Sequence, residues 1–319
     1  MVWFQKFEYA VGHWLQKSTE HVTGSVLCSP GCFSLFRAKT LMQNNVLAKY
    51  ATKSTKPRHY IQYDQGEDRW LCTLILQAGG RVEYCAASDA YTHAPESFYE
   101  FYNQRRRWIP STMANMFDLL NTSKQTRKVN NNISWLYMAY QWILMGDTII
   151  GPSFLYLMMV GAFVETFHID HWTSFWYNLI PLSIFLAVCF CCEERIQLIT
   201  AAVMTVIYSL IMVVVLVGMI LQVAAQGCFA PNTLLFFIVI GQFALTGLMH
   251  PKEWACLNSG FVYYITVPSM YMLLTIFSIF NVHNVTWGTR ESKVQVKVKS
   301  RKSTLFTYKE NYNLRSKYF

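Results

Sequence analysis

The chain has 319 residues, and its 27 lysines and arginines outnumber its 18 acidic residues to give a formal net charge of +9. Apolar residues make up 53% of the sequence and charged residues only 14%, and the apolar residues come in runs rather than in amphipathic stripes. This composition argues against an ordinary soluble domain and favours a protein whose solvent is largely the bilayer. We expect no nucleic-acid partner.

Residues 1–132 form the polar part, with glycine, proline and charge at intervals typical of loops. The length suits a portion of a cytosolic domain but not a complete one. Lys6, Glu8 and His13 interrupt the first apolar residues, so no cleavable signal peptide is predicted.

Residues 133–281 read as about five membrane spans, each near the roughly 20 apolar residues that cross a bilayer. We expect them at Ser134–Val164, Trp172–Cys192, Ile196–Val223, Pro231–Met249 and Leu257–Asn281. Because Gly151 and Pro152 disfavour regular helix, the first span could be one kinked helix or two short ones.

Residues 282–319 form a basic tail, which favours the cytoplasmic side. Five crossings would put this tail outside, and the two signals conflict. The sequon Asn284-Val285-Thr286 would be glycosylated if luminal. We predict a cytoplasmic tail.

The nine cysteines fall partly inside apolar runs, as Cys189 does, and Cys28 and Cys32 flank a Ser-Pro-Gly turn without a second ligand pair. Buried thiols are therefore favoured over a zinc site.

Two short motifs in the polar part carry chemistry. Glu67-Asp68-Arg69 precedes the apolar stretch 71–76, which could be helix or strand. An isolated motif of this kind is usually a helix start, where acidic residues suit the dipole. An acidic residue beside a bound diphosphate could instead accept the proton of an attacking hydroxyl.

The second motif is Gln104-Arg105-Arg106-Arg107-Trp108. Arginines alone would indicate a juxtamembrane basic patch. Guanidinium groups also bind diphosphates, tryptophan offers a flat face to a sugar or base, and glutamine offers a neutral hydrogen-bonding group. Together with the upstream acid, this pattern indicates glycosyl transfer from a sugar nucleotide.

Five motifs in one order give the chain a specific resemblance. They are Phe7-Glu8-Tyr9-Ala10 with Gly12-His13-Trp14-Leu15, Cys28-Ser29-Pro30-Gly31-Cys32-Phe33-Ser34, Gln65-Gly66-Glu67-Asp68-Arg69-Trp70, Gln104-Arg105-Arg106-Arg107-Trp108, and Trp287-Gly288-Thr289-Arg290-Glu291. In these motifs the chain resembles the C-terminal portion of an animal-type chitin synthase, an inverting, processive membrane glycosyltransferase.

The resemblance implies a mixed fold: part of an α/β, GT-A-like transferase domain, followed by a multispan helical bundle in the plasma membrane. In the family, the aspartate matching Asp68 is the general base, within Glu67-Asp68-Arg69, that activates the acceptor 4-hydroxyl for attack on UDP-N-acetylglucosamine. Arg107, with Arg105 or Arg106, would stabilise the diphosphate, and Trp108 would stack near the acceptor.

Two further motifs take roles by the same resemblance. Cys28, Ser29, Pro30, Gly31 and Cys32 correspond to a loop at the entrance of the product channel, although an ordinary Pro-Gly turn would look the same. Trp287, Gly288, Thr289 and Arg290 correspond to a cap over the active site. The implied partners are the growing chitin chain, the bilayer and a possible second copy of the chain.

One departure from the family pattern is the lack of an Asp-x-Asp sequence, which in the family binds the nucleotide and a divalent cation, Mg²⁺ or Mn²⁺. We therefore expect the cation only in a full enzyme, with no ligand in this chain, and expect the chain to be a fragment, a truncated gene product or an inactive short form.

Other readings stay open. A multispan transporter or channel would place polar residues at mid-span, but only Asp147 and Glu165 lie inside or at the end of such an apolar run. Cellulose and hyaluronan synthases share the acid and Gln-x-x-Arg-Trp pattern. A shortened chain could also serve as a membrane subunit of an intact synthase.

Overall fold

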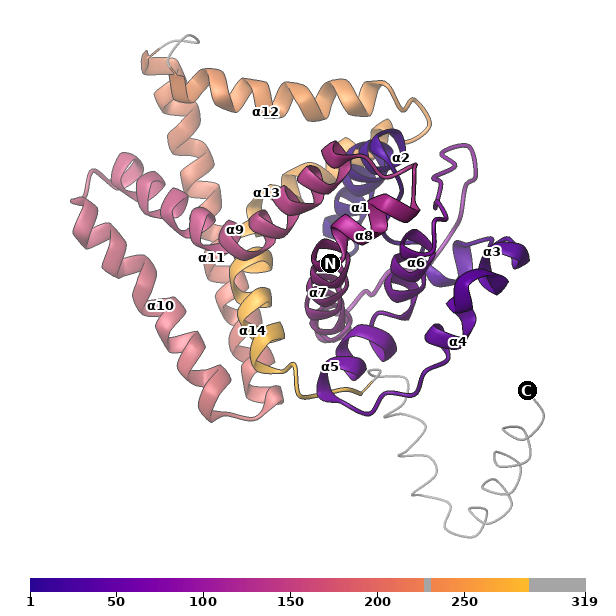
Figure 1. Cartoon of the computed structure of the whole chain (residues 1–319). Helices are drawn as coiled ribbons and strands as arrows, with labels where there is room; N and C mark the ends of the chain where they lie inside the picture. Colours follow the sequence, from indigo (N-terminus) through magenta and orange to yellow (C-terminus); the bar gives the residue numbers. More distant parts are fainter. Residues whose placement is uncertain (227–230, 287–319) are drawn as a thin grey trace. The chain divides into compact units, whose positions relative to one another are not determined.

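The computed structural model describes residues 1–226 and 231–286. Contacts divide the chain into two units, Met1–His283 and Asn284–Phe319. Within the first unit every regular element that the structure describes is helical (Figure 1). The boundary expected after residue 132 stays a prediction.

The lobe formed by the first 130 residues contains mostly short helices together with the longer α6 and α7 (Figure 1). Its helices are α1 (Val2–Val11), α2 (Ser18–Thr23), α3 (Ala38–Met42), α4 (Val46–Tyr50), α5 (Pro57–His59), α6 (Glu67–Gln77), α7 (Phe98–Asn121) and α8 (Ser123–Val129). A π-helical stretch, Gly12–Lys17, joins α1 to α2, and a second, Tyr60–Asp64, precedes α6.

The expected α/β portion of a transferase domain is not present among the described residues of this lobe, which include no strand. That expectation came from the family resemblance and not from any period-two pattern. The stretch 71–76 is mostly apolar and follows an acidic first turn at Glu67 and Asp68, and it continues as helix α6.

The bundle contains α9 (Trp135–Phe167), α10 (His171–Cys191), α11 (Glu194–Gln226) and α12 (Pro231–Leu248), followed by α13 (Gly260–Pro268) and α14 (Leu274–Phe280). A 3-10 stretch from Trp254 and a π-helical stretch from Ser269 make the last two helices one continuous span. Helices thus occupy all five expected places.

Among the described residues, four helical segments are long and apolar enough to cross a membrane: α9, α10, the part of α11 to Leu221, and Trp254–Phe280. The first expected span is one helix that contains Pro152. Helix α12 is not among the four, and Figure 1 shows it running across the direction of α11. Large apolar side chains such as Ile150, Phe190 and Leu210 are exposed on the crossing helices, as expected of surfaces that face lipid.

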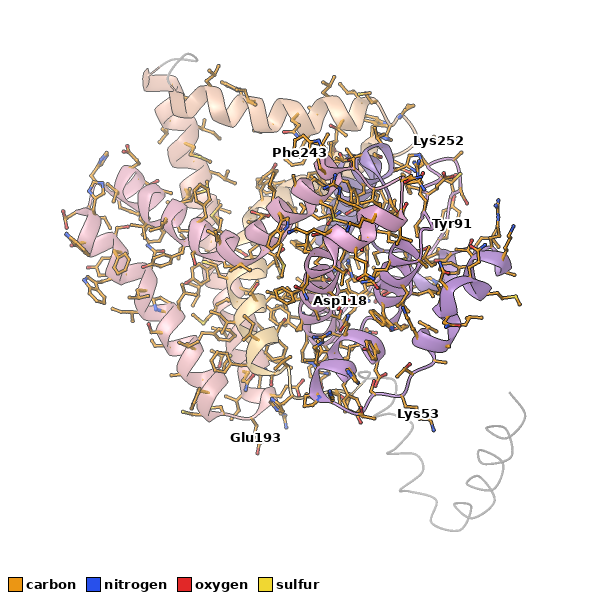
Figure 2. The ribbon with its side chains drawn as sticks, in the orientation of Figure 1. Lys53, Tyr91, Asp118, Glu193, Phe243 and Lys252 are labelled. Carbon is orange, nitrogen blue, oxygen red and sulfur yellow. The ribbon has the colours of Figure 1, made fainter. Side chains whose placement is uncertain are left out.

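Helix α7 connects the lobe to the bundle, since it packs against α6 and the stretch Tyr60–Asp64 on one side and against α9 and α14 on the other. Its first turn is capped because Ser97 accepts a hydrogen bond from the backbone of Glu100 at 3.1 Å. On its lobe side, Asp118 accepts a 3.0 Å hydrogen bond from Gln77 of α6 (Figure 2). The position of α7 therefore decides which lobe residues meet its arginines.

Candidate functional site

The acidic motif lies at the beginning of α6, with Gly66 as the N-cap and Glu67 and Asp68 in the first turn. Gly66 allows this helix end to approach α7 closely, because a Cβ atom there would lie 2.7 Å from the Cβ of Ser111. Ser111 follows Arg107 by one helical turn. The close approach therefore brings the acidic motif to the arginine motif.

Asp68 accepts hydrogen bonds from a backbone N–H and from a thiol. Its Oδ1 accepts a 2.8 Å hydrogen bond from the backbone N–H of Arg69, and its Oδ2 accepts one from the thiol of Cys28 at 3.6 Å. The backbone N–H of Ser29 in turn donates to the Sγ of Cys72, one turn along α6, at 3.3 Å. Asp68 and the turn at Cys28, two motifs 40 residues apart, thus form one site.

The electrostatics of Glu67 link this site to Arg107. Burial raises the pKa of Glu67 above its usual value, the neighbouring carboxylate of Asp68 adds to the rise, and the charge of Arg107 opposes it. Arg107 is thus the member of the arginine run whose charge acts on the start of α6.

The three arginines of α7 point in three directions, as expected of consecutive helical residues about 100° apart. Arg105 forms an ion pair with Glu8 of α1 and is nearly buried. Arg106 faces the bundle: burial lowers its pKa, and the carboxylate of Glu194 at the beginning of α11 opposes that shift. A single diphosphate therefore cannot face all three.

Gln104 and Trp108 flank the three arginines on α7. The guanidinium carbon of Arg105 lies 4.3 Å from the centre of the Trp108 ring, so this cation covers one face of the indole. The Oε1 of Gln104 is buried and accepts no hydrogen bond in the described part of the chain. Arg105 therefore occupies one face of the ring that was expected to stack on a sugar.

The turn at Cys28 to Cys32 lies beside Asp68 through Cys28. Ser29 donates to the hydroxyl of Ser34 at 2.6 Å, Ser34 donates to the backbone oxygen of Pro30, and a 3-10 turn begins at Gly31. The residues expected to cap the site, Trp287, Gly288, Thr289 and Arg290, lie outside the described residues.

The described His, Cys, Asp and Glu residues form no group of three that could hold a metal ion. They therefore offer no fit to the Mg²⁺ or Mn²⁺ expected for a full enzyme, and no step of the chemistry is assigned to such an ion here.

The chitin synthase family model matches residues 1–167, which include the whole lobe, both motifs of the site and α9. The chain belongs to the chitin synthase family. It is 52% identical over 292 residues to a chitin synthase of Meloidogyne artiellia, and 51% and 48% identical over 291 and 292 residues to two chitin synthases of Caenorhabditis elegans.

These matches cover 91–92% of this chain but only 16–22% of the relatives, so the chain spans about a fifth of the curated chitin synthases it matches. A fungal chitin synthase of Verticillium dahliae is 38% identical over 126 residues, which is 36% of this chain.

The residue pattern did not assign a role to several charged groups that surround the site of this chitin synthase segment. Glu8 pairs with Arg105, and burial raises the pKa of Glu8 despite that cation. Lys17 and Glu20 lie on the helix that follows, next to the turn at Cys28. A buried charge requires a partner, but residues 12–23 are largely polar, so the sequence pattern did not mark these charges as buried.

Proposed function

We propose that this chain supplies the acid–base and membrane-crossing part of a chitin synthase. The full enzyme would transfer N-acetylglucosamine from UDP-N-acetylglucosamine to the growing chitin chain and extrude the product across the plasma membrane. The supporting observation is the position of Asp68, which lies at the start of α6, bound by the Cys28 turn, where α6 meets the helix carrying Arg107.

The chemistry assigned to these residues is a single in-line displacement. The 4-hydroxyl of the acceptor attacks the anomeric carbon of the donor, and the bond from that carbon to the diphosphate breaks as UDP leaves with the electron pair. Asp68 takes the hydroxyl proton, and one displacement inverts the anomeric configuration. Arg107 would stabilise the negative charge of the leaving diphosphate.

Several features of the full enzyme belong to this proposal. We assign the α/β nucleotide-binding fold and its divalent cation to the part of the relatives that this chain does not span. Processive elongation, residence in the plasma membrane and assembly with a second copy are further expectations for the full enzyme.

The deciding experiment is Asp68→Asn in a synthase that carries this segment together with the full length of its relatives. We expect polymer formation to fall by about 100-fold or more, with UDP-N-acetylglucosamine binding kept, because the amide cannot take the proton. Asp89→Asn, an exposed residue of the same lobe, is the matched control. Near-normal synthesis by the Asp68 variant would remove it as the base.

The identity of the sugar needs a separate measurement. A product digested by chitinase supports the proposal. A product digested by hyaluronidase or cellulase would show that the enzyme makes another polysaccharide.

A further inference from the structure

Glu20 is a buried carboxylate with no role in the proposed chemistry. Only 3% of the residue is exposed, and one carboxylate oxygen accepts a 3.0 Å hydrogen bond from the backbone N–H of Leu27. Gln16 donates to the other oxygen at 3.4 Å. A buried carboxylate is costly unless it is hydrogen-bonded and faces positive charge, so its position is strongly specified.

The charges around Glu20 come from two helices. Burial raises its pKa, and the Leu27 N–H, Gln16 and the cation of Arg69 on α6 oppose that shift. On its own helix, Glu20 helps to keep Lys17 charged against the burial that lowers the pKa of that amine. The charge of this carboxylate therefore acts on cations of two elements, Lys17 before α2 and Arg69 in α6.

The segment that follows Glu20 packs against the first membrane span. Gln141 of α9 is fully buried, and neither of its side-chain polar atoms has a hydrogen-bond partner within the described part of the chain. Next to it on α9, Tyr137 packs against Gly24, where an added Cβ would lie 2.7 Å from the Tyr137 ring. The segment that Glu20 holds is therefore clamped between the lobe and the membrane bundle.

The segment from Glu20 to Leu27 leads directly to the residue that contacts the candidate base, Asp68. Leu27, whose N–H donates to Glu20, is followed by Cys28, whose thiol donates to Asp68 at 3.6 Å. Ser29 then donates to Cys72 at 3.3 Å. Three successive residues are thus bound to three different groups, and Glu20 is the first of these.

We propose that Glu20 is a positioning residue of the synthase site: by holding the backbone at Leu27, it keeps the thiol of Cys28 against Asp68. The assignment rests on the proposed function for its catalytic consequence. Its structural part, the placement of Cys28, is independent of catalysis and can be measured separately.

The first test measures the rate at which N-ethylmaleimide alkylates each cysteine, read by mass spectrometry on the full chain in membranes. Glu20→Ala should raise the Cys28 rate by about tenfold or more, because the hydrogen bond that holds Leu27 is lost. Glu20→Gln, which keeps an acceptor for that N–H, should raise it less. Glu96→Gln, an exposed carboxylate of the lobe, is the matched control.

Two other thiols serve as internal references. Exposed Cys85 should react at the parent rate, and buried Cys189 of α10 should stay protected, which shows that the bundle is folded. If Glu20→Ala also raises the alkylation rate of Cys189, the bundle is no longer folded, and the Cys28 rate of Glu20→Gln alone tests the proposal. A Cys28 rate equal to the parent rate in the folded variant would overturn the proposal.

The second test follows synthesis in the full-length enzyme. Glu20→Gln should lower kcat by about tenfold with the KM for UDP-N-acetylglucosamine unchanged, and Glu20→Asp should recover part of the loss. A faster Cys28 reaction with unchanged kcat would keep the placement of Cys28 but overturn its catalytic consequence. Loss of activity in Glu20→Gln with an unchanged Cys28 rate would overturn the positioning role and leave the proposed function standing.

Discussion

Gly66 lies directly against Ser111, so closely that a Cβ atom on residue 66 would sit 2.7 Å from the Cβ of Ser111 and 3.0 Å from its hydroxyl oxygen. This contact joins the first turn of α6 to the turn of α7 that follows Arg107. Since both atoms belong to short, rigid groups on helix backbones, neither can move away cheaply.

The first prediction concerns this contact. Gly66→Ala should force α6 away from α7 and destabilise the lobe by about 1–3 kcal/mol, as overpacking does. It should also lower polymer synthesis, because Asp68 moves with α6. The measurements are thermal unfolding in detergent and product formation. Gly161→Ala, where an added Cβ meets nothing within 4 Å, should be neutral in both.

A second prediction separates the arginines. Arg105→Gln should lower the free energy of unfolding by about 1–3 kcal/mol, because it leaves the partly buried Glu8 without its cation. Arg107→Gln should lower synthesis by about 100-fold with a smaller change in unfolding, because its charge serves the leaving diphosphate. Equal loss of stability in the two variants would contradict the different orientations assigned to the two side chains.

A third prediction concerns acid stability. Burial lowers the pKa of His13 to about 4, assisted by the charge of Lys17 and opposed by Glu253. Between pH 6.5 and 4 the unfolded chain binds a proton at His13 that the folded chain does not. Stability from neutral His13 is therefore present above pH 6.5 and lost as the pH falls towards 4.

The amount should be on the order of 1–2 kcal/mol, since His13 is only partly buried and solvent screens part of the effect. Thermal unfolding of His13→Gln at pH 7 and pH 5 should show a smaller difference than the parent shows. His93→Gln, an exposed histidine, should keep the parent's difference. An unchanged slope in His13→Gln would rule out this histidine as the source.

The fourth prediction concerns the side of the tail. The tail after Phe280 is basic, and basic flanks favour the cytoplasmic side of a membrane. We expect the sequon at Asn284 to carry no glycan. The parent and Asn284→Gln should then migrate identically before and after N-glycosidase; a shift confined to the parent would place the tail outside.

Much of the fold could be predicted from residue patterns, because a span depends on a local quantity, the length of an apolar run. All five expected spans are helices, and Pro152 does not divide the first. The acids at Glu67 and Asp68 mark a helix start by the dipole rule alone. The α/β portion that the family resemblance implied is not shown, since the described residues of the lobe contain no strand.

The amino-acid sequence by itself determined where the helices run, which residue types are available for glycosyl transfer, and the family to which the chain belongs. Tertiary structure alone decided which polar groups meet: Glu8 with Arg105, the thiol of Cys28 with Asp68, and the backbone N–H of Leu27 with Glu20. These pairs are separated by 97, 40 and 7 residues, and each depends on the rotation and packing of helices. Local helix propensity specifies neither the rotation nor the packing of the helices, because packing depends on contacts throughout the core.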